Sequence, residues 1–168
     1  MILELLFAFI IMAACVVIQM TSMVIFFDWL LRQRPRIEKH LTIMTYVLLL
    51  ILVFAVIVVL HLVNISLWAG FYYKRGLFPD YETSVYFSLG SYTTIGYGDV
   101  VLPQRWRLLG GLEGISGVLL SGLSTAFIFA IVNALFQIRI QKHSQSGNPT
   151  VAERVRSKLP AIRRFRRG

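Results

Sequence analysis

Three long apolar runs, separated by polar segments, dominate the hydrophobicity pattern of the chain. The first runs from Leu5 to Phe27 and the second from Leu41 to Leu67, and neither contains Asp, Glu, Lys or Arg. The third extends from Trp106 to Ile138 and holds one carboxylate, Glu113, well inside it. Apolar runs longer than about 18 residues are typical of transmembrane helices. The pattern therefore predicts an all-α membrane protein with three transmembrane helices.

The composition agrees with this interpretation. Of the 168 residues, 57% are hydrophobic and 15% are charged, whereas soluble domains carry about 25% charged residues. The N-terminus has Glu4 and no Lys or Arg before Arg32, so the first run does not resemble a cleaved signal peptide. Residues 1–30 carry no charged stripe, and we expect them to form a peripheral, lipid-facing helix. The single cysteine, Cys15, excludes an intrachain disulfide.

The net charge of +9 is distributed unevenly. Lys and Arg concentrate in the loop 31–40 and in the tail 139–168, which the positive-inside rule places in the cytoplasm. Three spans then leave the N-terminus outside. The loop arginines are two residues apart and are interrupted by Pro35, which argues against a voltage sensor, whose arginines lie within a span.

In the basic tail 139–168, a linker at residues 143–149 precedes residues 150–168, which combine apolar residues at helical spacing with many Lys and Arg residues, although Pro160 interrupts the pattern. A basic amphipathic helix is typical of binding to anionic lipids at the membrane surface. Nucleic-acid binding is the alternative for such a tail, but no other feature favours it, and we expect no nucleic-acid partner.

A short polar segment between the second and third spans reads FPDYETSVYFSLGSYTTIGYGDVVLP, from Phe78 to Pro103. Pro79 and Asp80 are a helix-start signal. Residues 81–93 could then form a helix about 20 Å long, which is too short to cross a bilayer, so the segment must enter the membrane and return. Non-helical backbone survives at membrane depth only when it is buried in protein or lines a water-filled path. The polar return leg therefore indicates a pore.

The sequence TIGYGD, from Thr94 to Asp99, resembles the selectivity filter of potassium channels. The order of the elements is also similar to the two-helix pore module of that superfamily. This module would cover residues 41–138, with an outer helix 41–67, a pore helix 81–93, a filter 94–98 and an inner helix 106–138. The resemblance implies a four-fold homotetramer with the pore on its axis, in a plasma (bacterial inner) membrane.

The chemistry of such a filter explains its residues. A potassium ion loses its water, and backbone carbonyl oxygens replace that water. Gly96 and Gly98 can adopt positive φ without steric cost, which lets successive carbonyls face one axis, while Ile95 and Tyr97 point away from it. We expect the filter residues to bind K⁺, with ions at Thr94, Ile95, Gly96 and Tyr97 and no other cofactor.

The support behind the filter departs from the pattern of the resembled family. Several potassium channels carry a glutamate four residues before the filter threonine, where it pairs with the aspartate after GYG, but this chain has Gly90 there. A carboxylate within a span is costly and indicates function. We therefore expect Glu113 to reach behind the filter and bond to hydroxyls or backbone of the pore helix, such as Ser91 or Tyr92. Tyr86 is an alternative partner for Asp99. The predicted support residues are Tyr86, Ser91, Thr93, Asp99 and Glu113.

The third span is rich in glycine, and two interpretations remain open. Small residues let membrane helices pack closely. The resembled channels also carry a hinge glycine in the inner helix, and Gly117 lies nearest to that place, with Gly122 second.

The function predicted from these features is passive, potassium-selective conduction. The sequence contains no acid/base pair, metal cluster or phosphate-binding loop, and we expect no enzymatic activity. Two alternatives are a weakly selective cation channel, because Gly90 removes the usual support, and a non-conducting regulatory subunit of a channel assembly.

Overall fold

The computed structural model describes the backbone of residues 2–39 and 42–145. Its elements are α1 (Ile2–Lys39), α2 (Ile43–Lys74), α3 (Tyr81–Tyr92), the short 3₁₀ helix η1 (Gln104–Trp106) and α4 (Arg107–Gln145). No strand occurs in these residues, and three of the helices are long and apolar enough to cross a membrane. The predicted all-α class and the three spans are confirmed.

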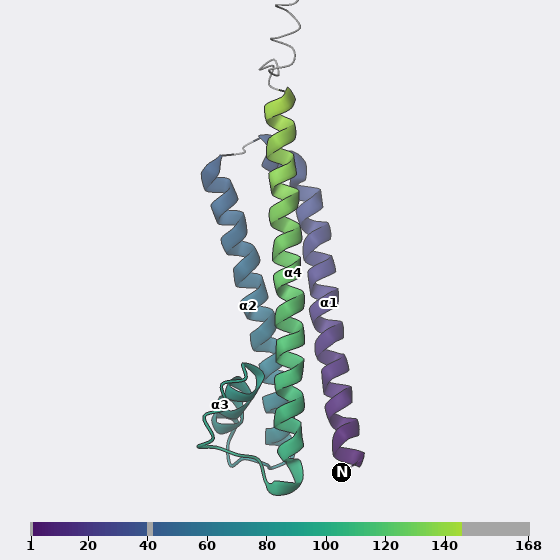
Figure 1. The fold of residues 1–168 in the computed structure, drawn as a ribbon, viewed down its shortest axis with the longest axis vertical. Helices are drawn as coiled ribbons and strands as arrows, with labels where there is room; N and C mark the ends of the chain where they lie inside the picture. Colours follow the sequence, from purple (N-terminus) through teal and green to yellow (C-terminus); the bar gives the residue numbers. More distant parts are fainter. Residues whose placement is uncertain (1, 40–41, 146–168) are drawn as a thin grey trace, which may run out of the picture. The chain divides into compact units, whose positions relative to one another are not determined.

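The chain divides into two compact units, residues 1–130 and 131–168. The first unit holds α1, α2, α3, the filter segment and α4 as far as Ala130. In this unit α1, α2 and α4 run side by side, and α3 lies near the end at which α1 begins (Figure 1). Of the second unit, the structure describes the helical residues 131–145.

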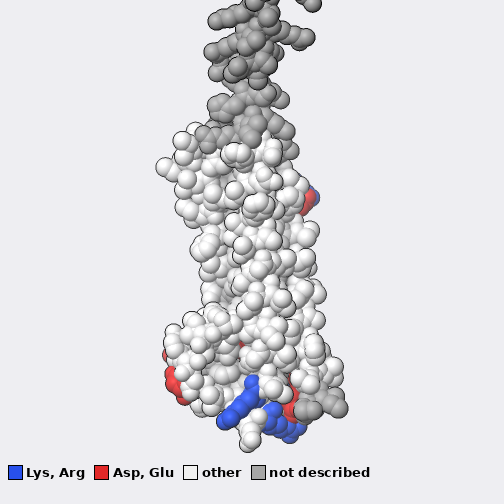
Figure 2. Space-filling model, viewed as in Figure 1, with Lys and Arg blue, Asp and Glu red and all other residues white. Residues whose placement is uncertain are grey.

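The surface of the molecule is consistent with a lipid environment. Figure 2 shows a face that is uncharged along most of its length, with most of the visible Lys, Arg, Asp and Glu gathered at the end where α3 and the loop after it lie, and one small charged spot at the edge far from that end. Many large apolar side chains of α1 and α2 are exposed on the surface of the chain and do not pack against its other helices. They are therefore suited to contact lipid.

The first helix is longer than the sequence indicated. The predicted loop 31–40 was wrong in its boundaries, because α1 continues to Lys39 and its backbone is helical through Pro35. This segment consists mainly of Arg, Gln, Lys and Glu, which are good helix formers. A single proline removes one backbone hydrogen bond but does not always end a helix.

The second helix also runs beyond its predicted end at Leu67. It begins after Thr42, whose side chain accepts a hydrogen bond from the backbone N–H of Thr45, and it ends only at Lys74. Gly76, with φ +64°, lies just beyond it, and the N–H of Leu77 bonds back to the carbonyl of Tyr72 at 3.1 Å. This is the left-handed glycine termination common at helix ends.

The inner helix α4 likewise extends past Ile138 to Gln145. The first residues of the predicted tail 139–168 are therefore helical. The expected lipid-binding pattern of residues 146–168 lies outside the described residues.

Candidate functional site

The pore helix α3 is fixed at both ends by local hydrogen bonds. At its start, Oδ1 of Asp80 accepts from the N–H of Thr83 at 2.7 Å, as the Pro–Asp signal predicted. At its end, the hydroxyl of Thr93 donates to the carbonyl of Leu89 at 2.6 Å. The helix ends at Tyr92, one residue before the predicted end. Its C-terminal end, which carries the negative pole of the helix dipole, therefore leads directly into the filter segment.

The filter backbone alternates in conformation. Thr94, Gly96 and Gly98 have φ values of 62°, 55° and 78°, and among the described non-glycine residues only Thr94 has a positive φ. Ile95 and Tyr97, whose φ angles are not positive, lie between these residues, so the sign of φ alternates along the strand. An alternating backbone of this kind turns successive carbonyls toward one side of the strand, which is the arrangement that cation coordination by carbonyl oxygens requires.

Hydrogen bonds and one ring contact tie this strand to α3. The N–H of Thr94 bonds to the carbonyl of Ser91 at 3.0 Å, and the N–H of Gly96 bonds to the carbonyl of Gly90 at 3.1 Å. The ring of Tyr97 stacks on that of Tyr86, with centroids 6.1 Å apart and planes at 12°. The position and orientation of the filter strand therefore depend on the last turn of α3.

Gly90 is buried behind the filter strand, without a side chain of its own. A Cβ built on Gly90 would have no neighbour closer than 3.9 Å. A cavity of about 30 Å³ lies between α3 and the filter, with Gly90 in its wall. The position at which the resembled channels carry a glutamate therefore contributes no side chain here, and the support of the filter must come from other residues.

Asp99 has a partner on α3. The hydroxyl of Tyr86 donates to Oδ2 of Asp99 at 2.7 Å, which is the alternative pairing expected from the sequence. Oδ1 of Asp99 accepts from the N–H of Val100 at 3.0 Å. The bond from Tyr86 lowers the pKa of the Asp99 carboxyl, and the same bond raises the pKa of the Tyr86 hydroxyl.

Replacement of Tyr86 by phenylalanine should change how the protein responds to acid. A lowered carboxyl pKa contributes stability above the ordinary pKa of Asp, and this contribution is lost as the pH falls through the lowered value. The wild type should therefore have a higher Tm than Tyr86→Phe near neutral pH, and the difference should shrink on acidification. Tyr81→Phe, on the same helix, is the control. A difference in Tm that does not vary with pH would contradict the role of Asp99.

Glu113 bonds to a residue that the sequence did not indicate. It is fully buried, and its Oε2 accepts a hydrogen bond from the hydroxyl of Tyr72 on α2 at 2.9 Å. The side chain turns from α4 toward the outer helix, and neither of its oxygens bonds to Ser91 or Tyr92, the two examples expected on the pore helix. The ring of Tyr72 lies in an aromatic cluster that also contains Phe78 and Phe87. Glu113 therefore joins the outer and inner helices behind α3.

Three glycines on one face of α4 allow this helix to approach the end of α3. A Cβ on Gly110 would lie 3.2 Å from the Phe87 ring, and one on Gly114 would lie 3.1 Å from the carbonyl oxygen of Ser91. A Cβ on Gly117 would overlap the carbonyl oxygen of Tyr92. The structure thus gives Gly117 a packing role. The backbone of α4 is helical through both Gly117 and Gly122, the two predicted hinge positions.

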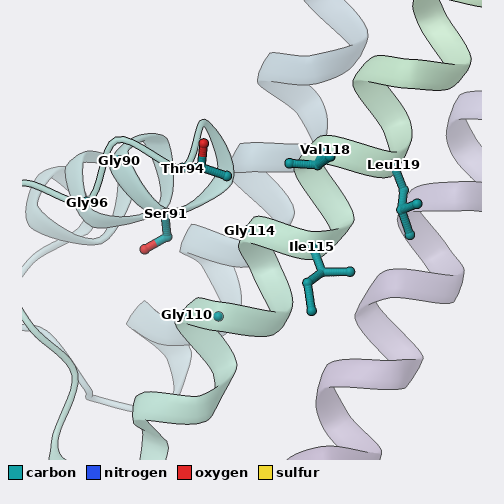
Figure 3. A pocket seen from close by; sticks show the side chains of 10 residues that line it. Gly90, Ser91, Thr94, Gly96, Gly110, Gly114, Ile115, Val118 and Leu119 are labelled. Atoms are coloured by element: carbon teal, nitrogen blue, oxygen red, sulfur yellow. The ribbon is translucent and has the colours of Figure 1, made fainter.

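The same face of α4 borders a groove beside the filter. The groove, of about 490 Å³, is lined by the end of α3 and the filter on one side and by α4 on the other (Figure 3). Its walls include the backbone of Gly90 and Gly96 and the side chains of Ile115 and Val118. In one chain this part of the filter is therefore uncovered.

Sequence reasoning did not predict that a group of polar side chains from different spans lies together between them. Gln19, Asn64 and Ser124 are almost fully buried, and His61 is partly buried beside them. The available signal was the presence of an amide or imidazole within an apolar run, which is costly in lipid and usually functional. Their presence corrects the expectation that residues 1–30 form a purely lipid-facing helix.

Comparison with known proteins agrees with this geometry. Residues 46–134, just over half of the chain, match the ion channel family. A stretch of 73 residues, 43% of this chain, is 40% identical to the calcium-gated potassium channel TvoK of Thermoplasma volcanium, and the match covers 20% of that relative's length. No solved structure gives a significant match. Because the family match includes α3 and the whole filter segment, and three helices can cross a membrane, this chain is a multi-pass membrane protein that belongs to the ion channel family.

Proposed function

We propose that this protein is a potassium-selective channel that conducts K⁺ passively through its filter backbone. The observation that carries the proposal is the alternation of φ at Thr94, Gly96 and Gly98 within the sequence TIGYG. The partial match to a protein named as a potassium channel supports the same ion. The filter would replace the water around K⁺ with rings of carbonyl oxygens, while the C-terminal end of α3 favours a cation beside it.

The proposed channel is a homotetramer. Non-helical backbone at membrane depth must be buried in protein or line a water-filled path, yet the groove beside the filter is open in one chain. Ile95 and Tyr97 are also exposed, at 56% and 69%. Neighbouring copies around a four-fold axis would cover these side chains and supply the missing carbonyl oxygens.

The proposed location is a plasma (bacterial inner) membrane, with the N-terminus outside and the C-terminus in the cytoplasm. Arg105, next to the filter loop, forms an ion pair with Glu4 at the start of α1. This ion pair supports a location of the N-terminus and the filter loop on the same side of the membrane. The basic residues after Ile138 favour the opposite, cytoplasmic side and are proposed to contact anionic lipids.

Reversal potentials test the proposed function. The purified protein would be placed in planar bilayers with high K⁺ and low Na⁺ on one side and low K⁺ and high Na⁺ on the other, with protein-free bilayers as the control. We expect a reversal potential close to the K⁺ equilibrium potential. A reversal near zero would instead favour the weakly selective channel, to which the cavity at Gly90 lends some support. Absence of current would favour the non-conducting subunit.

A further inference from the structure

A continuous set of hydrogen bonds links α1 to the last residue of α3. Nε2 of Gln19 donates to Oγ of Ser124 at 3.0 Å, and Oε1 of Gln19 accepts from Nδ2 of Asn64 at 3.0 Å. His61 lies 3.1 Å from the same Ser124 oxygen through Nε2, and its Nδ1 lies 2.9 Å from the hydroxyl of Tyr92. These five residues, termed the buried polar network, come from the helices α1, α2, α3 and α4.

The contacts of Ser124 determine the direction of the hydrogen bonds. Its hydroxyl has one proton and two acceptor positions, and the proton is donated to the carbonyl of Leu120 at 2.9 Å. The Ser124 oxygen then accepts from both Gln19 and His61. Nε2 of His61 must therefore carry its proton, which leaves Nδ1 to accept from the hydroxyl of Tyr92. In this arrangement the Ser124 hydroxyl and both ring nitrogens of His61 each have a hydrogen-bond partner.

We propose that Gln19 is a positioning residue for the filter, so that the N-terminal helix α1 helps to hold the filter in its conducting form. This inference rests on the proposed channel function and deepens it. Through Ser124 and His61, Gln19 restrains the Tyr92 side chain. Tyr92 ends α3, and the two backbone bonds from the filter are accepted by the carbonyls of Gly90 and Ser91, within two residues of it.

The membrane environment strengthens this argument. In hydrocarbon, a polar side chain that loses its partner has no water to replace that partner. The Gln19 amide is fully buried, and its two bonds lead to α2 and α4 rather than to its own helix. The carbonyl of Tyr92 also contacts the face of α4 at Gly117. The end of α3 is therefore held both by its side chain and by its backbone.

The test is Gln19→Leu, which keeps most of the side-chain volume and removes both hydrogen bonds. Met20→Leu, at the adjacent and partly exposed position, is the matched control. We expect the K⁺-to-Na⁺ permeability ratio of Gln19→Leu to fall by about threefold or more, the factor that corresponds to an average hydrogen bond between membrane helices. Met20→Leu should keep the wild-type ratio. A lower Tm with an unchanged ratio would overturn the proposal, because it would reveal a purely structural role.

A second pair of variants addresses the possibility that Gln19→Leu fails to fold. Ser124→Ala removes the oxygen shared by Gln19 and His61, whereas Ser124→Thr retains a hydroxyl. We expect a reduced permeability ratio in Ser124→Ala and recovery in Ser124→Thr. Equal ratios in these two variants would contradict a role for the shared oxygen.

Hydrogen exchange separates this proposal from the proposed function, because it does not require current. The amides of residues 93–96 should exchange faster in Gln19→Leu than in the wild type or Met20→Leu. If the wild type carries no K⁺ current, the proposed channel function is wrong. The exchange rates of these amides still show whether α1 restrains the filter segment. Equal exchange rates in all three proteins would overturn the proposal.

Discussion

Gly117→Ala should strongly impair folding of the pore, because the added Cβ would overlap the carbonyl oxygen of Tyr92. This neighbour is backbone and cannot rotate away. Overpacking of this kind costs about 1–3 kcal/mol or more per chain. We expect a reduced Tm in detergent and loss of K⁺ current from the protein that remains folded.

Gly70→Ala on α2 is the matched control, because a Cβ there would meet nothing within 4 Å and Gly70 does not line the groove beside the filter. Alanine is the better helix former by about 1 kcal/mol, so this variant should be at least as stable as the wild type. If Gly117 served only as a hinge, Gly117→Ala would keep the wild-type Tm and alter opening alone. That outcome would refute the packing role.

Glu113→Leu should be the second severe substitution. It removes the acceptor of the Tyr72 hydroxyl, which is buried among aromatic rings. An unsatisfied buried hydroxyl costs about 1–3 kcal/mol. Because Tyr72 and Glu113 join α2 to α4 behind the pore helix, we expect both a lower Tm and a shorter lifetime of the conducting state in single-channel recordings.

Glu113→Gln is the informative comparison, since its amide oxygen can still accept from Tyr72. We expect this variant to lie much closer to the wild type than Glu113→Leu does in both measurements. Equal Tm values for the leucine and glutamine variants would show that the hydrogen bond to Tyr72 contributes little.

The features that the sequence predicted well depend on neighbouring residues. The three spans follow from apolar runs, and the start of α3 follows from the side chain of Asp80, which bonds three residues along the chain. The contact between Tyr86 and Asp99 spans 13 residues of one re-entrant segment. In each case the local geometry leaves few alternatives.

The features that could not be predicted depend on how the helices are rotated against one another. Gln19 and Ser124 are 105 residues apart, and Glu113 and Tyr72 are 41 apart. An apolar helix with no polar face gives little indication of which side is buried, since lipid and protein interior favour the same side chains. The position of Gly117 against Tyr92 has the same origin. The helical path through Pro35 was missed because proline is a weak guide to where a long helix ends.

The positive φ of Thr94 has a thermodynamic consequence for the filter. A β-branched residue in the left-handed region stores about 1–3 kcal/mol of backbone strain, and Thr94 has a φ of 62°. In the proposed channel, K⁺ binds the ordered strand and not a relaxed one, so the ion acts as a folding ligand that stabilises the strand by mass action. The conducting geometry would then depend on the concentration of the ion it transports, and Thr94 is where a strand deprived of K⁺ would relax first.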